Sequence, residues 1–111
     1  MPNVLKAAAG VIDRLLVFGT DYDTPDGTAV RDYIHIEDLA NVHALSLDYL
    51  RDGGASDFLN LGNGRGYSVM EVIETARQVT GKTVEYDVRQ RRPGDASALV
   101  ACADKAQNLL E

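Results

Sequence analysis

Cysteine is nearly absent from this chain, and long hydrophobic runs are absent altogether. Cys102 is the single cysteine among 111 residues, which excludes an internal disulfide framework and a multi-cysteine metal site. No apolar run reaches the roughly eighteen residues that a membrane-spanning helix needs. Residues 1–16 carry Lys6, Asp13 and Arg14 and lack the compact apolar region and cleavage site of a secretory signal. These absences predict a cytoplasmic protein in a reducing compartment, without a membrane as partner.

Basic residues are also too few to balance the acidic ones. The chain has 11 Lys and Arg against 17 Asp and Glu, for a formal charge of −6. Nucleic acids and anionic membranes require a basic surface, so neither is expected to bind. The length fits one domain spanning residues 1–111, which would bury roughly two thirds of the surface that the unfolded chain exposes.

Strand-like and helix-like patterns alternate along the chain and predict an α/β fold. Helices are expected at residues 2–10, 37–50 and 69–80 and from residue 104, and strands at 15–19, 30–36, 57–62 and 84–90. Ser68 and Glu71 match a capping box at the start of the third helix, and Gly81 ends it. The first helix has no preceding strand and the last one ends after barely two turns, so the fold is expected to be incomplete at both ends.

The stretch from Ala29 to Ala40 combines a strand-like half with the start of a helix. Alternation places Arg31, Tyr33 and His35 on one face of the strand and Val30, Asp32, Ile34 and Ile36 on the other. A cation and an aromatic ring about 7 Å apart on one face suit an anionic ligand that carries a ring or a hydroxyl group. The alternative is an ordinary strand edge where Arg31 pairs with a neighbouring carboxylate.

Arginines cluster at Arg89, Arg91 and Arg92, followed closely by Asp95, in an otherwise acidic chain. Planar guanidinium groups favour bidentate contacts with phosphate, and the intervening Pro-Gly turn could direct Arg92 inward. The alternative is a solvated basic loop that balances nearby acidic residues. Convergence of Arg31 and Arg92 on one diphosphate would be the more specific arrangement.

The remaining polar motifs have simpler interpretations. The glycine-rich segment from Gly62 to Gly66 lacks the spacing and the lysine of a phosphate loop, so a plain turn is predicted. His35 is expected to hydrogen-bond at the junction of strand and helix, His43 to lie on a helix face, and Cys102 to be a buried, inert thiol. No metal site assembles, and no group of residues forms a recognisable catalytic arrangement.

Several motifs together resemble the substrate-domain signature of UDP-glucose 4-epimerases, within the extended short-chain dehydrogenase/reductase family. They are Phe18 to Thr28, Val30 to His35, Asp38 to Ala40, Asn60 to Gly64, Gly66 to Val69 and Arg91 to Asp95. The resemblance covers nearly the whole chain in order. It implies a small mixed sheet with flanking helices, equivalent to the C-terminal substrate-binding portion of the family.

The resemblance also implies roles for individual residues. Arg31 and Arg92 would hold the diphosphate of a UDP-sugar, and Asp95 would bind the ribose hydroxyls. The residues that would line or shape the nucleotide pocket are Leu16, Phe18, Tyr33 and Val69. Leu99 stands where many members carry a tyrosine that contacts phosphate, and Cys102 stands where an aspartate is usual.

The NAD-binding half of such enzymes, with its catalytic residues, has no counterpart in this chain. The resemblance therefore implies a chain that anchors UDP-glucose or UDP-galactose while a missing half performs the hydride transfer with NAD. The chain alone is expected to be inactive and to bind no NAD. Without that half, the strand from Phe58 to Gly62 would have an unpaired edge, which predicts self-association or strand exchange between copies. The alternatives are a stand-alone, non-catalytic binding or assembly module, and a fragment of another nucleotide-sugar dehydratase or epimerase.

Overall fold

The computed structural model describes residues 1–110, and the chain divides into two compact units. Unit 1 comprises Met1–Arg31 and Gly66–Leu99, and unit 2 comprises Asp32–Arg65 and the segment that begins at Val100. The length predicted one domain, so this division is a difference from the sequence-based expectation. The family resemblance implied one mixed sheet, whereas the strands form two small sheets.

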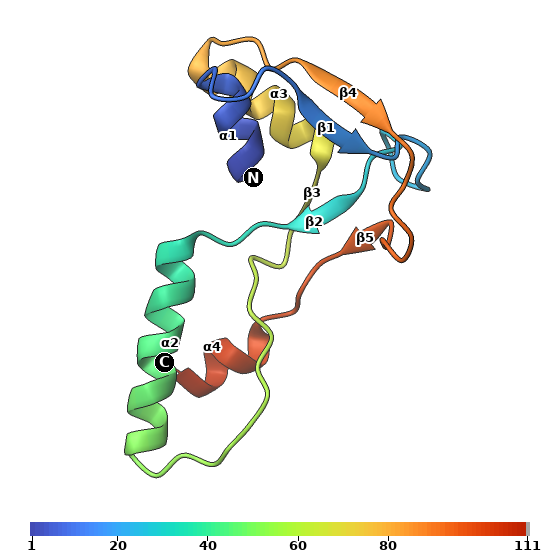
Figure 1. Cartoon of the computed structure of the whole chain (residues 1–111). Helices are drawn as coiled ribbons and strands as arrows, with labels where there is room; N and C mark the ends of the chain where they lie inside the picture. Colours follow the sequence, from blue (N-terminus) through green and yellow to red (C-terminus); the bar gives the residue numbers. More distant parts are fainter. Residues whose placement is uncertain (111) are drawn as a thin grey trace. The chain divides into compact units, whose positions relative to one another are not determined.

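Unit 1 packs two helices against a pair of parallel strands (Figure 1). Helix α1 (Pro2–Ala8) and helix α3 (Val69–Thr80) lie beside each other, and β1 (Leu15–Phe18) pairs in parallel with β4 (Tyr86–Arg89). The buried side chains of these elements form one apolar core. They are Val4, Ala7 and Ala8 of α1, Leu15 and Val17 of β1, Val72, Ile73 and Ala76 of α3, and Val84 just before β4.

The second sheet has three short strands in the order β3-β2-β5. They are β2 (Val30–Asp32), β3 (Gly66–Ser68) and β5 (Ala98–Leu99), and β2 runs parallel to β5 with Arg31 opposite Leu99. The alternating pattern predicted a strand as far as residue 36, but β2 ends at Asp32. The strand β5 was not predicted, because a two-residue strand leaves no periodic signal in the sequence.

Unit 2 contains helix α2 (Ile36–Arg51) and helix α4 (Asp104–Leu110), joined by contacts between them. The predicted strand at residues 57–62 is wrong: this segment has no regular secondary structure, and Phe58 is 94% exposed. A strand requires hydrogen bonds from a neighbour, and no described residue of the chain supplies them. Helix α2 has no buried residue, although its apolar stripe predicted that much of its surface would be covered.

Local signals at the helix ends are confirmed. Pro2 occupies the first turn of α1, and Gly81 follows α3 in the left-handed conformation at φ +64°. The Ser68 hydroxyl accepts from the Glu71 amide at 3.0 Å while the Glu71 carboxylate accepts from the Ser68 amide at 2.7 Å. These contacts span only a few residues, so the sequence alone specifies them.

Within residues 1–110, no helix is long and apolar enough to cross a bilayer. The same residues contain no group of three or more His, Cys, Asp or Glu side chains arranged to hold a metal ion.

Candidate functional site

Phe18, Arg92 and Asp95 lie together in unit 1. The Arg92 guanidinium carbon lies 4.9 Å from the centre of the Phe18 ring, within the range of a cation–π contact. Arg92 Nε donates to Asp95 Oδ2 at 2.9 Å, and Nη2 lies 2.9 Å from the same oxygen. Arg92 therefore contacts two other residues predicted from the family resemblance, Phe18 and Asp95. Phe18 on β1 is 74 positions from Arg92 and 77 positions from Asp95 in the sequence.

The face of the β1–β4 sheet that carries Phe18 is the solvent side. Leu15 and Val17 are buried in the core, while Leu16 is 45% exposed and Phe18 is half-buried. Because side chains alternate along a strand, Leu16 and Phe18 share the outer face. Arg89 is opposite Phe18 in the parallel register and so belongs to the same face. The outer face therefore exposes Leu16 and Phe18, with Asp87 and Arg89 opposite them on β4.

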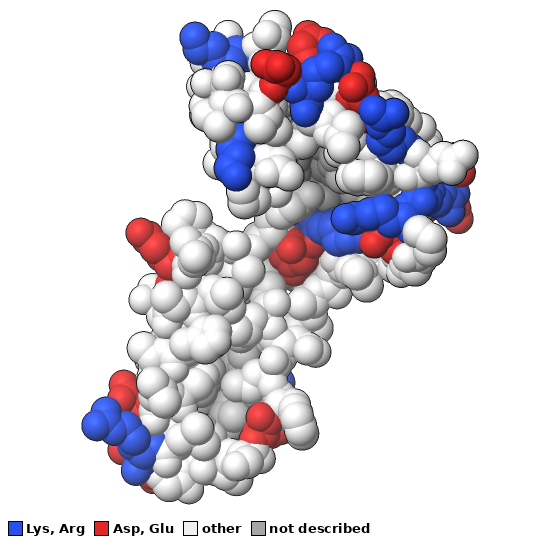
Figure 2. All heavy atoms as spheres, in the orientation of Figure 1, with Lys and Arg blue, Asp and Glu red and all other residues white. Residues whose placement is uncertain are grey.

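Arg31 lies on β2, half-buried, and its Nη1 donates to the Val30 carbonyl at 2.7 Å. Among residues 1–110, no carboxylate forms an ion pair with it. The structure therefore does not support the alternative in which Arg31 simply balances a neighbouring acidic side chain. Figure 2 shows Lys and Arg side chains gathered in a band on the visible face of unit 1, in the region of β2 and of the segment that precedes β5.

Val69 begins α3, and its amide donates to the Ala29 carbonyl at 3.1 Å, which holds the start of the helix against the residue before β2. Tyr33 lies outside β2 and belongs to unit 2, whereas the other six predicted site residues belong to unit 1. The strand predicted to carry Arg31 and Tyr33 on one face ends at Asp32, so Tyr33 is not part of it. In unit 2 the Tyr33 carbonyl accepts a hydrogen bond from the Asn63 side chain.

Asp26 connects the loop before β2 to the start of α3. Its Oδ1 accepts from the Thr28 hydroxyl at 2.7 Å and the Thr28 amide at 2.9 Å, and its Oδ2 accepts from the Ser68 hydroxyl. Thr28 and Ser68 are 1% and 3% exposed, so these hydrogen bonds satisfy buried groups. Burial raises the pKa of Asp26, but the hydrogen bonds from Ser68 and Thr28 outweigh it, and the net pKa is lowered. The sequence singled out neither Asp26 nor Thr28.

Replacing Asp26 by asparagine is expected to lower the free energy of unfolding by about 1–3 kcal/mol at pH 7, because buried hydroxyls lose a charged acceptor. A carboxyl group whose pKa is lowered in the folded state stabilises the protein above its unfolded pKa of about 3.9, and this stabilisation is lost as the pH falls through the folded-state pKa. Thermal unfolding of both chains from pH 7 down to pH 3 should show the difference in Tm shrinking below about pH 4. Asp23→Asn, an exposed change on the same loop, is the control; a pH-independent difference for Asp26→Asn would contradict the assignment.

The glycine-rich segment from Gly62 to Gly66 bends at Gly62 and Gly64, and Gly66 begins β3. The Asp32 carboxylate accepts from the amides of Asn63 at 3.0 Å and Gly64 at 3.2 Å, and from that of Ala101 at 3.3 Å. A carboxylate of the chain thus already occupies the position that a phosphate would take in a phosphate-binding loop. At Gly62 a Cβ atom would lie 2.3 Å from Asp32 Oδ2, so the close approach requires glycine there.

The two histidines behave as predicted, and the cysteine does not. His35 caps α2 by accepting from the Glu37 amide at 3.2 Å, and His43 is exposed on α2 with Nδ1 2.6 Å from the Leu39 carbonyl oxygen. The prediction of a buried thiol is wrong, because Cys102 is exposed. Its apolar sequence neighbours suggested burial, but the segment before α4 lies at the surface.

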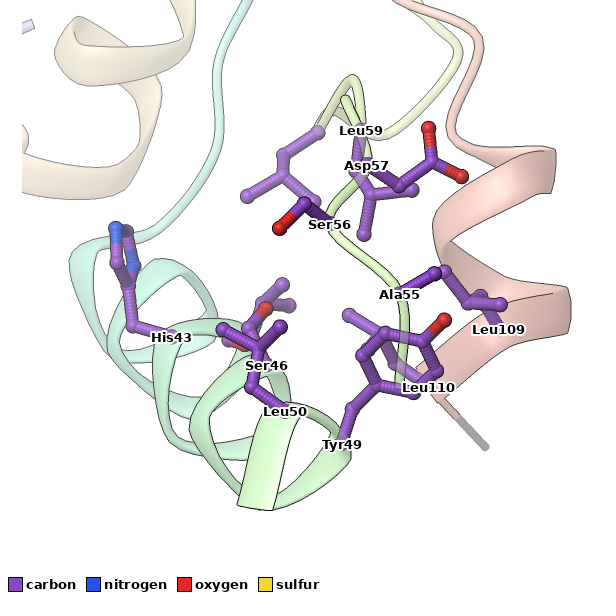
Figure 3. A pocket seen from close by; sticks show the side chains of 12 residues that line it. His43, Ser46, Tyr49, Leu50, Ala55, Ser56, Asp57, Leu59, Leu109 and Leu110 are labelled. Carbon is purple, nitrogen blue, oxygen red and sulfur yellow. The ribbon is translucent and has the colours of Figure 1, made fainter. Parts of the chain in front are cut away.

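Unit 2 has its own apolar groove, separate from the candidate site. It has a volume of about 290 Å³, and α2, the segment after it and α4 form its walls (Figure 3). A second hollow of about 550 Å³ lies between α2, the turn at residues 61–63 and α4. None of the seven predicted site residues lines either one.

Comparison with known proteins identifies the family. A model of the NAD dependent epimerase/dehydratase family matches residues 1–62. UDP-glucose 4-epimerase of Halalkalibacterium halodurans is 50% identical over 110 residues, 99% of this chain and 33% of that protein. The enzyme of Azospirillum brasilense is 54% identical over 105 residues, 95% of this chain and 30% of that protein. The chain thus spans about a third of the length of the curated relatives it matches.

Solved structures of UDP-glucose 4-epimerases also superpose on this chain. UDP-glucose 4-epimerase from Brucella ovis in complex with NAD superposes with a TM-score of 0.90 at 45% identity, over 98% of this chain and 34% of that one. The enzyme from Bifidobacterium longum in complex with NAD+ and UDP gives 0.86 at 45% identity, over 98% of this chain and 32% of that one.

The family match covers the N-terminal part of this chain and does not reach residues 63–111. It does not support the expected assignment of all 111 residues to a C-terminal substrate domain, and we do not retain that placement. The mixed α/β fold, by contrast, agrees with the solved epimerases over almost its whole length. The match covers more than half of the sequence, and the chain belongs to the NAD dependent epimerase/dehydratase family.

Proposed function

We propose that unit 1 binds the diphosphate and ribose of a UDP-sugar, as part of a UDP-glucose 4-epimerase. The observation that carries the proposal is the position of Arg92, which stacks on Phe18 and pairs with Asp95. An aromatic ring, a guanidinium group and a carboxylate side by side can contact a base or sugar ring, a phosphate and a pair of hydroxyl groups.

Arg92 and Asp95 can exchange partners when a nucleotide binds. The Nε hydrogen bond and the Nη2 ion-pair contact of Arg92 both end on Oδ2 of Asp95, so the second carboxylate oxygen can accept a ribose hydroxyl. The Arg92 side chain is 62% exposed, so its remaining N–H groups can reach a phosphate. Arg31 would supply the second cation, since none of the described carboxylates compensates its charge.

The charge of the chain as a whole does not oppose this proposal. Most cationic residues belong to unit 1, which makes unit 1 close to neutral and leaves the acidic excess in unit 2. The unit 1 cations are Lys6, Arg14, Arg31, Arg77, Lys82, Arg89, Arg91 and Arg92. An anionic ligand can therefore approach the candidate site without strong repulsion.

In the whole protein, NAD and the catalytic groups would lie outside these residues, and UDP-glucose and UDP-galactose would be the substrates. Anchoring the nucleotide lets binding energy from a non-reacting part of the substrate support hydride transfer at the sugar. The described residues would thus hold the substrate in a cytoplasmic enzyme, and the chain alone would neither epimerise sugars nor bind NAD.

Calorimetric titration of the 111-residue chain with UDP, dTDP and GDP tests the proposal. UDP is expected to bind, and to bind more tightly than the other two nucleotides. Failure of UDP to bind would overturn the proposed function for this chain. Tighter binding of dTDP or GDP would instead favour a different nucleotide-sugar dehydratase or epimerase.

We also propose that copies of the chain associate through unit 2. Phe58 is 94% exposed, and Leu47 and Leu50 of α2 are 62% and 50% exposed. Large exposed apolar side chains beside an apolar groove favour association. Sedimentation velocity at high concentration is expected to show dimers or larger species, which Phe58→Asp reduces to monomers. Val79→Asp, at an 80% exposed position of α3 in unit 1, should not change the distribution. A clean monomer for the unmodified chain would contradict the association and favour a stand-alone module.

A further inference from the structure

The three arginines of the 89–92 segment lie in different surroundings. Arg89 ends β4, is exposed, and has no ion pair with any of residues 1–110. Arg91 Nε donates to Asp21 Oδ1 at 2.7 Å, and its guanidinium carbon lies 4.4 Å from the centre of the Tyr22 ring. Arg92 instead faces Phe18 and Asp95. Residue type alone does not distinguish these three side chains, but their contacts do.

Contacts on several sides hold Arg91 against the loop from Gly19 to Thr28. Its Nη2 donates to the Asp21 carbonyl in addition to the bond from Nε. Beneath the guanidinium, the Tyr22 ring is 5% exposed. A Cβ atom on Gly19 would lie 2.8 Å from Arg91 Cγ and 2.6 Å from Tyr22 Cε2, so the stem of Arg91 packs closely on the backbone. With its polar groups engaged in this way, Arg91 is poorly placed to bind a ligand itself.

These contacts restrict the position of the next residue, Arg92. The Gly19 amide donates to the Arg89 carbonyl at 2.8 Å, which joins the backbone before Arg91 to the end of β1. The Arg91 side chain, in turn, is hydrogen-bonded to the loop at Asp21. Phe18, which Arg92 covers, directly precedes Gly19. The chain around Arg91 is therefore tied to the same short stretch that carries the ring under Arg92.

We propose that Arg91 is a positioning residue for Arg92: by attaching the 89–92 segment to Asp21 and Tyr22, it holds the Arg92 guanidinium over Phe18, ready for a diphosphate. The inference rests on the proposed function for its ligand, but the arrangement of the two arginines does not depend on it. A long, flexible side chain held in its binding geometry loses less entropy when a ligand arrives. Arg91 thus contributes to affinity without contacting the nucleotide.

The first test uses no ligand. In proton NMR spectra, the Arg92 side-chain protons are expected to be shifted upfield by the Phe18 ring, and Phe18→Leu should abolish the shift. Arg91→Met is expected to reduce it strongly, whereas Lys82→Met, which removes the same charge at an exposed position between α3 and β4, should preserve it. Asp21→Asn removes the negative charge that pairs with Arg91 and should act in the same direction as Arg91→Met, which covers the case that Arg91→Met does not fold. Retention of the Arg92 shift in both Arg91→Met and Asp21→Asn would overturn the proposal.

The second test uses UDP. Arg91→Met is expected to weaken UDP binding about tenfold in the unmodified chain and to have little further effect in an Arg92→Met background, because its contribution passes through Arg92. Equal losses in both backgrounds would show that Arg91 acts on its own or only on the fold, and would overturn the proposal. If the unmodified chain does not bind UDP, the proposed function fails, while the NMR test still decides the role of Arg91.

Discussion

Replacing Arg92 by methionine is expected to weaken UDP binding to this chain by about 10- to 100-fold. A hydrogen bond to a charged group contributes about 1.5–3 kcal/mol, and each 1.4 kcal/mol corresponds to a factor of ten. Methionine keeps a long, unbranched apolar side chain and removes the guanidinium that stacks on Phe18. Calorimetric titration of the two chains with UDP measures the effect, and Arg31→Met is expected to fall in the same range.

Two controls make this result specific. Lys82→Met removes an equal charge from unit 1 at an exposed position between α3 and β4, without an ion pair among the described residues, and should change UDP affinity less than about threefold, as for a screened surface charge. Uridine has no phosphate, so its binding should be nearly insensitive to Arg31→Met. If Lys82→Met weakens UDP binding as much as Arg92→Met, only the general positive charge matters and the specific diphosphate contact is wrong.

Replacing Gly27 by alanine is expected to lower the free energy of unfolding by about 3–5 kcal/mol, in the range reserved for severe local disruption. Gly27 has φ +79°, and an added Cβ would lie 2.1 Å from the Thr20 carbonyl oxygen, a backbone atom that cannot move alone. The Gly27 carbonyl also accepts from the Tyr22 amide at 2.9 Å. Relieving the clash would shift the loop and disturb the buried Tyr22.

Gly10→Ala is the matched control in the same unit. Gly10 also has a positive φ, +72°, but a Cβ there would meet nothing within 4 Å. Its cost should therefore be only the left-handed conformation, about 1–2 kcal/mol. Urea denaturation of the three chains measures both effects. Equal losses for the two variants would show that backbone conformation alone matters, and that the close approach of Gly27 to Thr20 is not important.

The candidate site was only partly accessible from the sequence. The family resemblance pointed to Phe18, Arg92 and Asp95, and the structure brings these three together. Residue type by itself could not separate Arg91 from Arg92, because adjacent arginines differ only in the residues that long-range folding places beside them. The sequence did not indicate a structural role for Asp26 for the same reason: one of its hydrogen-bond partners, Ser68, is 42 positions away.

Elements that depend on contacts between near neighbours were determined by the sequence itself. Helix α3, its capping box and its terminal glycine follow from hydrogen bonds that span three or four residues. The same holds for Pro2 at the start of α1 and for His35 at the start of α2.

Only the tertiary structure decided the rest, because strands, burial and ion pairs depend on partners that are distant in the chain. Residues 57–62 were predicted to form a strand but find no partner strand among the described residues, whereas Ala98 and Leu99 have no strand signal and pair with β2. Cys102 has apolar neighbours yet is exposed. The sequence determined which residues could bind an anion; long-range packing determined that Arg92 faces Phe18 while Arg91 is held by Asp21 and Tyr22.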